Sequence, residues 1–520
     1  MISDIISYCW IYFCGIDETE TATKCNWELY IDLLLIALAL SINNVMIEVS
    51  ATPAIIVTES GSSTPGDSLS ILHGFLEFSI LYFSIINSWY LYSHHYTSRF
   101  CLSRGGGDAT TSKIQSLLTA CFIIGMTLSA LMCDYSNISS SYHRSSITND
   151  PTHKISSNEY KSVQLFSLSM ILQRIAVFVM IARVAIYIPL VSPVCAFLGF
   201  FIGDSILCYT LSAADISAAP FLWTFVIVME LHIDFFLLVL NNNGHEHVND
   251  ENGERITRHR SNNQQQYSRA SLSYNLKSTM DRVWIIMLAP FGALIVTITT
   301  NPDCTNDKLL ICSSITLMLL FALLYYDLQH TAYEEVVSRG SELCRVLLLT
   351  LIKFLGWGIW TVGSCLVSIL VRDGHNRHHL DQNDTAGMPP PILYDSIVGI
   401  HLLLGWSVGG SLILFLALRL FGGRRRSGLQ RWNRRGLIEA TWVMACWAPF
   451  LVVLIPSRRT DFTIATYLVI VSILNIIESW INFAELPSAD YSDDEENDHD
   501  ERQRLLQSTA NDSLGVYATA

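Results

Sequence analysis

Long apolar runs alternate with short polar segments along the whole chain. Each run holds about 20 residues, the length at which an α-helix crosses roughly 30 Å of hydrocarbon. Hydropathy and run length predict about twelve transmembrane helices, and the pattern therefore predicts an all-α, polytopic integral membrane bundle. The predicted spans are 27–50, 70–93, 112–133, 162–183, 185–211, 218–241, 280–300, 308–328, 345–371, 393–420, 436–456 and 463–485.

The polar segments divide the chain into three parts. We expect a cytosolic N-terminal segment at 1–26, a multi-pass domain at 27–485, and an acidic, disordered cytosolic tail at 486–520. Within the multi-pass domain, the polar loops 134–161 and 372–392 are predicted outside and the loop 242–279 inside. The fourth and fifth spans are hard to separate, because Pro189 and Pro193 make the fifth irregular.

Composition supports the membrane class and gives no sign of a nucleic-acid partner. Of the 520 residues, 51% are hydrophobic and only 15% are charged, too few charges to cover a soluble protein of this length. The formal net charge is −14, and much of the excess acid lies in the tail segment 490–501. We therefore expect the chain to meet lipids rather than nucleic acids.

Basic residues predict the orientation of the chain in the membrane. With the N-terminus cytosolic, the inside loops collect most of the arginines, as the positive-inside rule requires. Two glycosylation sequons, at Asn137 and Asn383, then fall in outside loops. Both termini are predicted cytosolic. The arginine cluster at 424–435 would also attract anionic lipid headgroups.

The tail carries a short sorting pattern. Glu501 is followed by the pair Leu505–Leu506, an acidic dileucine arrangement of the kind that sorting adaptors read. We predict either an endosomal, lysosomal or vacuolar address or the plasma membrane.

Two pairs of acids lie within predicted spans. Glu28 and Asp32 are four residues apart and project from one helix face, as do Glu230 and Asp234. Both pairs occur in the pattern E-L-x-I-D, on spans that run in opposite directions, which is consistent with an inverted repeat around a shared site. His232 lies within the second pair and titrates near neutral pH.

Each pair of acids has two interpretations. The acids could coordinate a proton or cation, because an ionised carboxylate in hydrocarbon costs about 2.5–3.5 kcal/mol and is kept for a reason. Alternatively, they form buried structural pairs with bases, such as Arg99, Arg174 or Arg183 for the first pair. Arg174 and Lys353 lie deepest in their spans and are the best counter-ion candidates. Pairing between acids and bases also accounts for most of this wider set of intramembrane charges, which is Glu48, Glu77, Arg174, Arg183, Asp204, Lys353, Glu439 and Glu478.

Histidines cluster in two polar loops. One cluster is His245, His247 and His259, and the other runs from His375 to His379. Neither has the ligand spacing of a closed structural metal site, and both are interpreted as solvated loops. We predict no metal and no cofactor.

Three segments give the chain a resemblance to a known family. The first span contains E-L-Y-I-D-L-L-L at 28–35, the second ends in W-Y-L-Y at 89–92 before Arg99–Phe100, and a later one ends in L-Y-Y-D at 324–327 before Glu334–Glu335. In this order they resemble the motifs of the bacterial low temperature requirement protein A family. The likeness covers roughly residues 27 to 345.

One motif of that family is incomplete in this sequence. Asp281–Arg282 matches its acid–base pair, whereas Ser278 stands where the family has a histidine and the final acid is absent near 291–293. The resemblance implies a multi-pass membrane protein linked to growth in the cold, and it implies no defined reaction.

Three classes of function are weighed. The favoured one is a transporter or channel for a proton, ion or small solute, in which Asp32, Glu230 and Asp234 bind the cargo or gate against Arg174 or Lys353. An intramembrane enzyme is disfavoured, because metalloprotease, serine-hydrolase and nucleotide-loop motifs are missing. The alternative is a non-catalytic scaffold or a protein of lipid or cold adaptation.

Overall fold

The computed structural model describes most of the predicted membrane domain. The described residues are Ile31, 34–43, 67–101, 109–135, 157–187, 192–243, 276–301, 304–339, 342–382, 392–422, 432–454 and 460–485. They form helices and short connections, and no strand occurs among them. The all-α class is thus confirmed for the described part of the chain.

Twelve of the labelled helices are long α-helices or the two parts of a broken one, and the others are a π-helix and a short 3-10 turn. Beside the N-proximal helix Leu34–Asn43, the elements are α3 (Asp67–Tyr90), η1 (Leu91–Cys101, π), α4 (Ala109–Tyr135), α6 (Ser157–Tyr187), α7 (Ser192–Ala214), η3 (Ile216–Ala218, 3-10), α8 (Ala219–Leu231), α9 (Ile233–Asn243), α11 (Leu276–Thr300), α12 (Lys308–Arg339), α13 (Glu342–Gln382), α14 (Ile392–Gly422), α15 (Trp432–Val453) and α16 (Thr460–Glu485).

Eight helices in the described residues are long and apolar enough to cross a membrane, or nine if α8 and α9 count as one bent span. Every predicted span contains helix; 218–241 corresponds to the bent pair, and 27–50, 70–93 and 436–456 are not among the nine. In the described residues, the first and eleventh of these predicted spans contain the shorter apolar helices Leu34–Asn43 and Ile438–Val453. The count of twelve is not confirmed.

Several boundaries differ from those expected. α6 continues to Tyr187 and α7 begins at Ser192, so the predicted fifth span starts too early. Pro189 lies outside the described residues, and Pro193 is the second residue of α7, where a missing N–H costs no helical hydrogen bond. α6 begins before the predicted loop 134–161 ends, and α13 continues well into the predicted loop 372–392.

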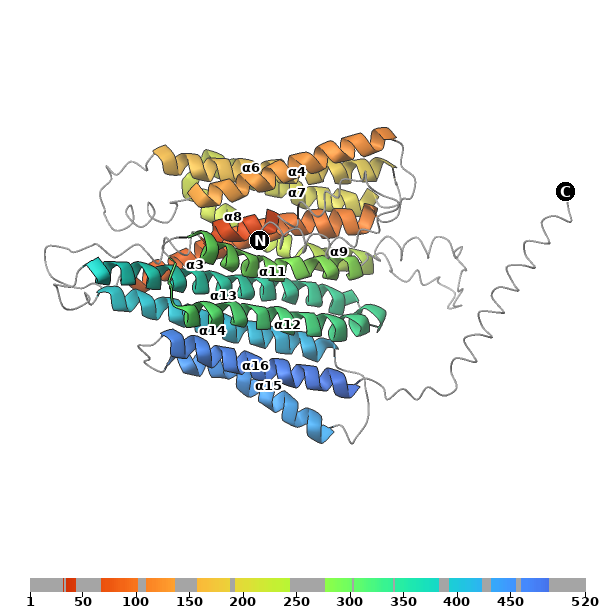
Figure 1. Cartoon of the computed structure of the whole chain (residues 1–520). Helices are drawn as coiled ribbons and strands as arrows, with labels where there is room; N and C mark the ends of the chain where they lie inside the picture. Colours follow the sequence, from red (N-terminus) through yellow and green to blue (C-terminus); the bar gives the residue numbers. More distant parts are fainter. Residues whose placement is uncertain are drawn as a thin grey trace, which may run out of the picture.

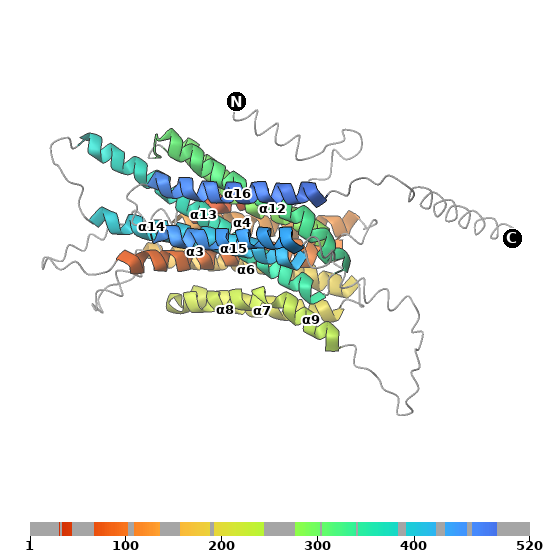
Figure 2. The ribbon, with the colours of Figure 1, turned by 90° about the horizontal axis from the view of Figure 1, so that it is seen from below.

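The helices run along a common direction and divide into two groups. In Figure 1, α4, α6 and α7 pack together on one side, and α12, α14, α15 and α16 on the other. α3, α8, α11 and α13 lie between them. Figure 2 shows the same alignment after a quarter turn, with α7, α8 and α9 along one edge.

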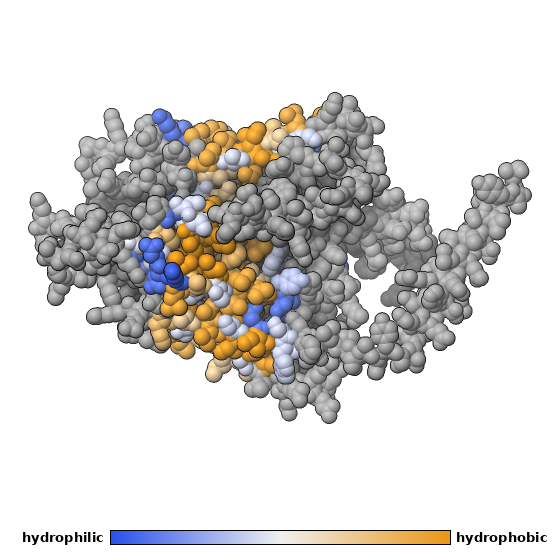
Figure 3. Space-filling view, viewed as in Figure 1, coloured by the Kyte–Doolittle hydropathy of each residue, from blue (hydrophilic) through white to orange (hydrophobic). Residues whose placement is uncertain are grey.

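Apolar side chains cover the described surface between the helix ends. Figure 3 shows this surface as largely hydrophobic. Phe221 is 85% exposed, Met444 75% and Ile186 76%, exposures that would be unfavourable in water. Outward apolar residues of this kind are what lipid chains solvate, and they support an integral membrane protein.

α13 is the central helix of the bundle. Within Leu343–Gly374, 83% of an apolar 18-residue stretch is buried. Trp360 donates from its indole N–H to the carbonyl of Ile286 on α11 at 2.7 Å. Near the other end, Thr305 donates its backbone N–H to Leu370 and its hydroxyl to Asp373, at 3.0 and 2.7 Å. These contacts fix the depth of α13 against α11 and the loop before α12.

α4 and α6 pack closely through small and polar residues. The hydroxyls of Ser129 and Ser169 are 2.7 Å apart, and the amide of Gln173 donates to Ser129 at 2.8 Å. Gly125 lies one turn away in the same seam, where a Cβ would be 2.7 Å from Cγ of Gln173 and 3.1 Å from the carbonyl oxygen of Ser169. Small residues that admit a neighbouring backbone are the usual basis of helix association in membranes.

We predict that Gly125→Ala destabilises the protein by about 1–3 kcal/mol, because the added methyl forces α4 and α6 apart. The midpoint of thermal unfolding in detergent measures the effect. Gly203→Ala on α7 is the matched control, since a Cβ there meets nothing within 4 Å. Equal midpoints for the two variants would contradict the close packing described at this seam.

Candidate functional site

The predicted sixth span is broken at its centre. α8 ends at Leu231 and α9 begins at Ile233, with a bend of 45° between them. Glu230 is in the last turn of α8, and Asp234 is in the first turn of α9. A helix N-terminus favours a negative charge, so the break provides a stabilising position for Asp234 inside the bundle.

Glu230 pairs with Arg174 of α6. The guanidinium donates from Nε to Oε1 at 3.1 Å and from Nη2 to Oε2 at 2.9 Å, which makes the pair bidentate. Both side chains are 1% exposed. Such a pair compensates much of the free-energy cost of burying two charges, because each carboxylate oxygen accepts a hydrogen bond from the guanidinium.

Two further helices complete the surroundings of Arg174. On α3, the hydroxyl of Ser88 accepts from Nη1, and the carbonyl of Ser84 accepts from Nη2 at 3.4 Å. On α7, the ring of Tyr209 lies under the guanidinium, 4.8 Å from its centre. Arg174 therefore joins α3, α6, α7 and α8 through one side chain.

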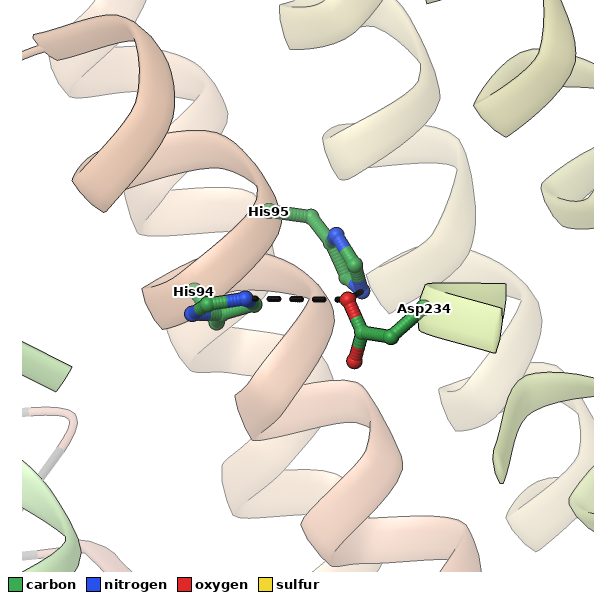
Figure 4. Close-up of side chains that lie close together, drawn as sticks. All are labelled: His94, His95 and Asp234. Carbon is green, nitrogen blue, oxygen red and sulfur yellow. Dashed lines mark ion pairs between the residues drawn. The ribbon is translucent and has the colours of Figure 1, made fainter. Parts of the chain in front are cut away.

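Asp234 lies at the centre of a second polar cluster. The Tyr90 hydroxyl donates to Oδ2 at 3.1 Å. Nε2 of His94 and Nε2 of His95 are each 3.7 Å from Oδ1. Figure 4 shows the two imidazoles approaching the carboxylate from the same helix, with Asp234 on the facing segment. The exposures of His94, His95 and Asp234 are 0%, 1% and 5%, so the cluster is shielded from the exterior.

The π-helix η1 explains how two consecutive histidines reach one carboxylate. Adjacent side chains on an α-helix diverge by about 100°. The i→i+5 bonding of a π-helix adds a residue to each turn and reduces that angle, and π-helical turns often occur at functional sites. The Tyr90 ring stacks on His94, with centroids 4.5 Å apart, and meets His95 edge-on at 5.4 Å.

Lys353 of α13 adds a positive charge beside this cluster. Its ammonium stands over the Tyr90 ring, 3.6 Å from the centroid, and it interacts electrostatically with Asp234 and Glu230. With neutral imidazoles, the charges of Arg174, Lys353, Glu230 and Asp234 sum to zero. A small cavity of about 10 Å³ lies against Tyr90 and Lys353. This volume is roughly enough for one water molecule.

The structure brings four of the predicted site residues together: Arg174, Glu230, Asp234 and Lys353. His232 is not part of the site, because it is exposed and its Nδ1 lies 2.7 Å from the carbonyl oxygen of Val228. Seven further predicted residues lie outside the described part of the chain, namely Glu28, Asp32, Asn137, Asn383, Glu501, Leu505 and Leu506.

Some of the remaining intramembrane charges also pair. Arg419 of α14 lies 3.1 Å from Glu478 of α16, and its guanidinium stands over the Trp442 ring of α15 at 5.8 Å. This second ion pair joins three helices of the other group, as the pairing interpretation expects. The two predicted histidine clusters lie outside the residues whose side chains are described.

Sequence reasoning missed the two histidines of the site. The histidines predicted from the sequence were those of the polar loops and His232, whereas His94 and His95 follow the aromatic stretch 89–92, which carried the family resemblance. A consecutive His–His pair directly after a predicted span is itself a signal, because ionisable residues in or beside membrane helices are rare and usually functional.

Comparison with known proteins gives no match to any family model, curated protein or solved structure.

We predict that Arg174→Met destabilises the protein by about 3–5 kcal/mol, because it leaves the carboxylate of Glu230 buried without its partner. Adding Glu230→Gln to Arg174→Met should recover a large part of that loss by removing the unpaired charge. Thermal unfolding of the purified single and double variants measures both effects. A double variant less stable than Arg174→Met would rule out the ion pair as the source of the effect.

Proposed function

We propose that this chain is a transporter or channel for an ion or small solute, with its pathway passing through the cluster around Asp234. In this proposal the chain is a membrane protein of the low temperature requirement A type, with about twelve spans and no enzymatic activity. The observation that carries it is a carboxylate at the break of a broken span, buried among two imidazoles, a phenol and an ammonium.

Broken helices are a recurring device of transport proteins. Where a span is interrupted, its half-helix ends present polar groups at mid-membrane depth without exposing backbone to lipid. Here the helix is interrupted at His232, Asp234 faces the histidines of η1 (Figure 4), and α9 contacts α13.

The two acids of the broken span support different roles. Glu230 is held in a bidentate pair and is fully used by Arg174. Asp234 keeps Oδ1 at 3.7 Å from both imidazoles, beyond the usual length of a hydrogen bond. We therefore assign Glu230 a structural role and Asp234 the role of binding the cargo. Lys353 is the neighbouring positive charge that limits the affinity of Asp234 for a cation.

The alternative is a membrane scaffold or lipid-adaptation protein. The buried ion pairs and the basic segment 424–435 would suit that role as well, since both stabilise or anchor a bundle without moving anything. The proposed partners are membrane lipids, an ion or small solute, and sorting adaptors through the tail. The proposed locations are the plasma membrane and the endolysosomal or vacuolar membrane, with both termini cytosolic.

We predict that Asp234→Asn abolishes flux in liposomes reconstituted with the purified protein, because it removes the cargo-binding charge. Proton, alkali-metal and divalent-cation flux are followed with internal dyes. Asp204→Asn on α7, another acid within a span, is the matched control and should transport normally. Asp32→Asn tests the predicted first-span acid in the same assay.

The scaffold alternative predicts a different pattern. A folded wild-type protein that moves none of these ions under a range of gradients would favour the scaffold. If the wild type transports an ion and Asp234→Asn transports it equally well, the protein is a transporter whose pathway does not use this cluster.

A further inference from the structure

We infer that His94, His95 and Asp234 form a binding site for a divalent transition-metal ion of the zinc class. The inference rests on the proposed function and names the class of cargo that would pass through its central cluster. Within the described residues, these three are the side chains whose ligand atoms lie close enough to share one ion, all within 4.8 Å of one another.

The distances suit a shared ion better than direct hydrogen bonds. Each imidazole Nε2 is 3.7 Å from Oδ1 of Asp234, well beyond the 2.7–3.2 Å of a nitrogen–oxygen hydrogen bond. Zinc bonds to nitrogen and carboxylate oxygen at about 2.0–2.2 Å, so two tetrahedral ligands lie about 3.3–3.5 Å apart. A shift of a few tenths of an ångström would bring each nitrogen to the separation from Oδ1 that two ligands of one ion have, and the ligand atoms all lie within 4.8 Å of one another.

The carboxylate is oriented for this role. Tyr90 donates to Oδ2, which leaves Oδ1 directed at the two imidazoles. A hydrogen bond to the outer oxygen of a ligating carboxylate is a typical second-shell contact, and it fixes the ligand before the metal arrives. The stacking of Tyr90 on His94 fixes one of the two rings as well.

The donor set indicates the class of metal. Two imidazole nitrogens and one carboxylate oxygen suit zinc, and also divalent iron, cobalt and manganese, whereas calcium and magnesium prefer oxygen ligands alone. Three protein ligands leave at least one coordination position for water or another ligand, as in exchangeable rather than closed structural sites.

The charges around the site indicate a passing ion rather than a resident one. Arg174 on α6 is neutralised by Glu230 on α8, whereas Lys353 on α13 stands over the Tyr90 ring and opposes a second cation nearby. Ion pathways need binding strong enough for entry and weak enough for release. The positive charge of Lys353 weakens binding of the metal ion enough for release, so removing this charge should tighten metal binding.

Metal binding is tested on untagged, full-length protein in detergent. Co²⁺ gives a visible d–d spectrum that reports coordination by nitrogen and oxygen, and titration with Zn²⁺ then displaces it. We expect one Co²⁺ per chain at this site, and at least a 10-fold loss of affinity in His94→Gln, His95→Gln and Asp234→Asn, since even second-shell changes cost about 10–100-fold. Lys353→Met should bind Co²⁺ several-fold more tightly than the wild type.

His232→Gln is the matched control. This histidine is two residues from Asp234 but exposed and outside the site, so its variant should bind Co²⁺ as the wild type does. Because a variant of the cluster could fail to fold, the wild type gives a second readout: Zn²⁺ should raise its thermal midpoint. Wild-type affinity in folded His94→Gln, or no rise of the midpoint with Zn²⁺, would overturn the metal site.

Binding and flux together separate this inference from the proposed function. Ion flux that depends on Asp234 without Co²⁺ binding would keep the transporter and reject the metal. Co²⁺ binding at the three residues without flux of any ion would keep the metal site and reject transport.

Discussion

The interaction on which the site depends is the buried pair of Arg174 and Glu230. A charge surrounded by hydrocarbon is costly unless a partner meets it with good geometry, and here two hydrogen bonds of 3.1 and 2.9 Å join the two side chains. Ser84, Ser88 and Tyr209 bring α3 and α7 to the same guanidinium. The pair thereby fixes α8 against three helices just before the chain bends. The position of Asp234, four residues later, follows from that anchor.

The break between α8 and α9 gives two similar acids different surroundings. On a straight helix, side chains four residues apart would lie on one face about one turn apart. The 45° bend turns Asp234 away from Arg174 and toward the histidines of η1. One acid then stabilises the bundle, while the other faces groups that bind protons or metals. The site therefore depends on irregular backbone in two places: the helix break positions Asp234, and the π-helix opposite it positions His94 and His95.

The packing around the site places it at the junction of the two helix groups. α3 contacts α8 on one side and α13 and α14 on the other, and its continuation η1 contacts α6 and α11. Tyr82 of α3 donates to the carbonyl of Lys353, which fixes the ammonium-bearing turn of α13 beside Tyr90. α13 also contacts α9, so movement of α13 against α9 would change the distance between Lys353 and Asp234. A cluster at such a junction is well placed to respond to changes in bundle shape.

The sequence by itself determined the all-helical membrane class, because apolar runs of spanning length leave the backbone no other way to satisfy its hydrogen bonds in lipid. It also singled out Arg174, Glu230, Asp234 and Lys353, since charge is rare in such runs. The tertiary structure alone decided which charges meet, because a guanidinium can pair with any acid at its depth. It placed His94 and His95 on Asp234 through a π-helix and a helix break, neither of which has a simple residue signature. It also excluded His232, which the sequence places between the two acids, because the bend leaves that one side chain on the outer surface.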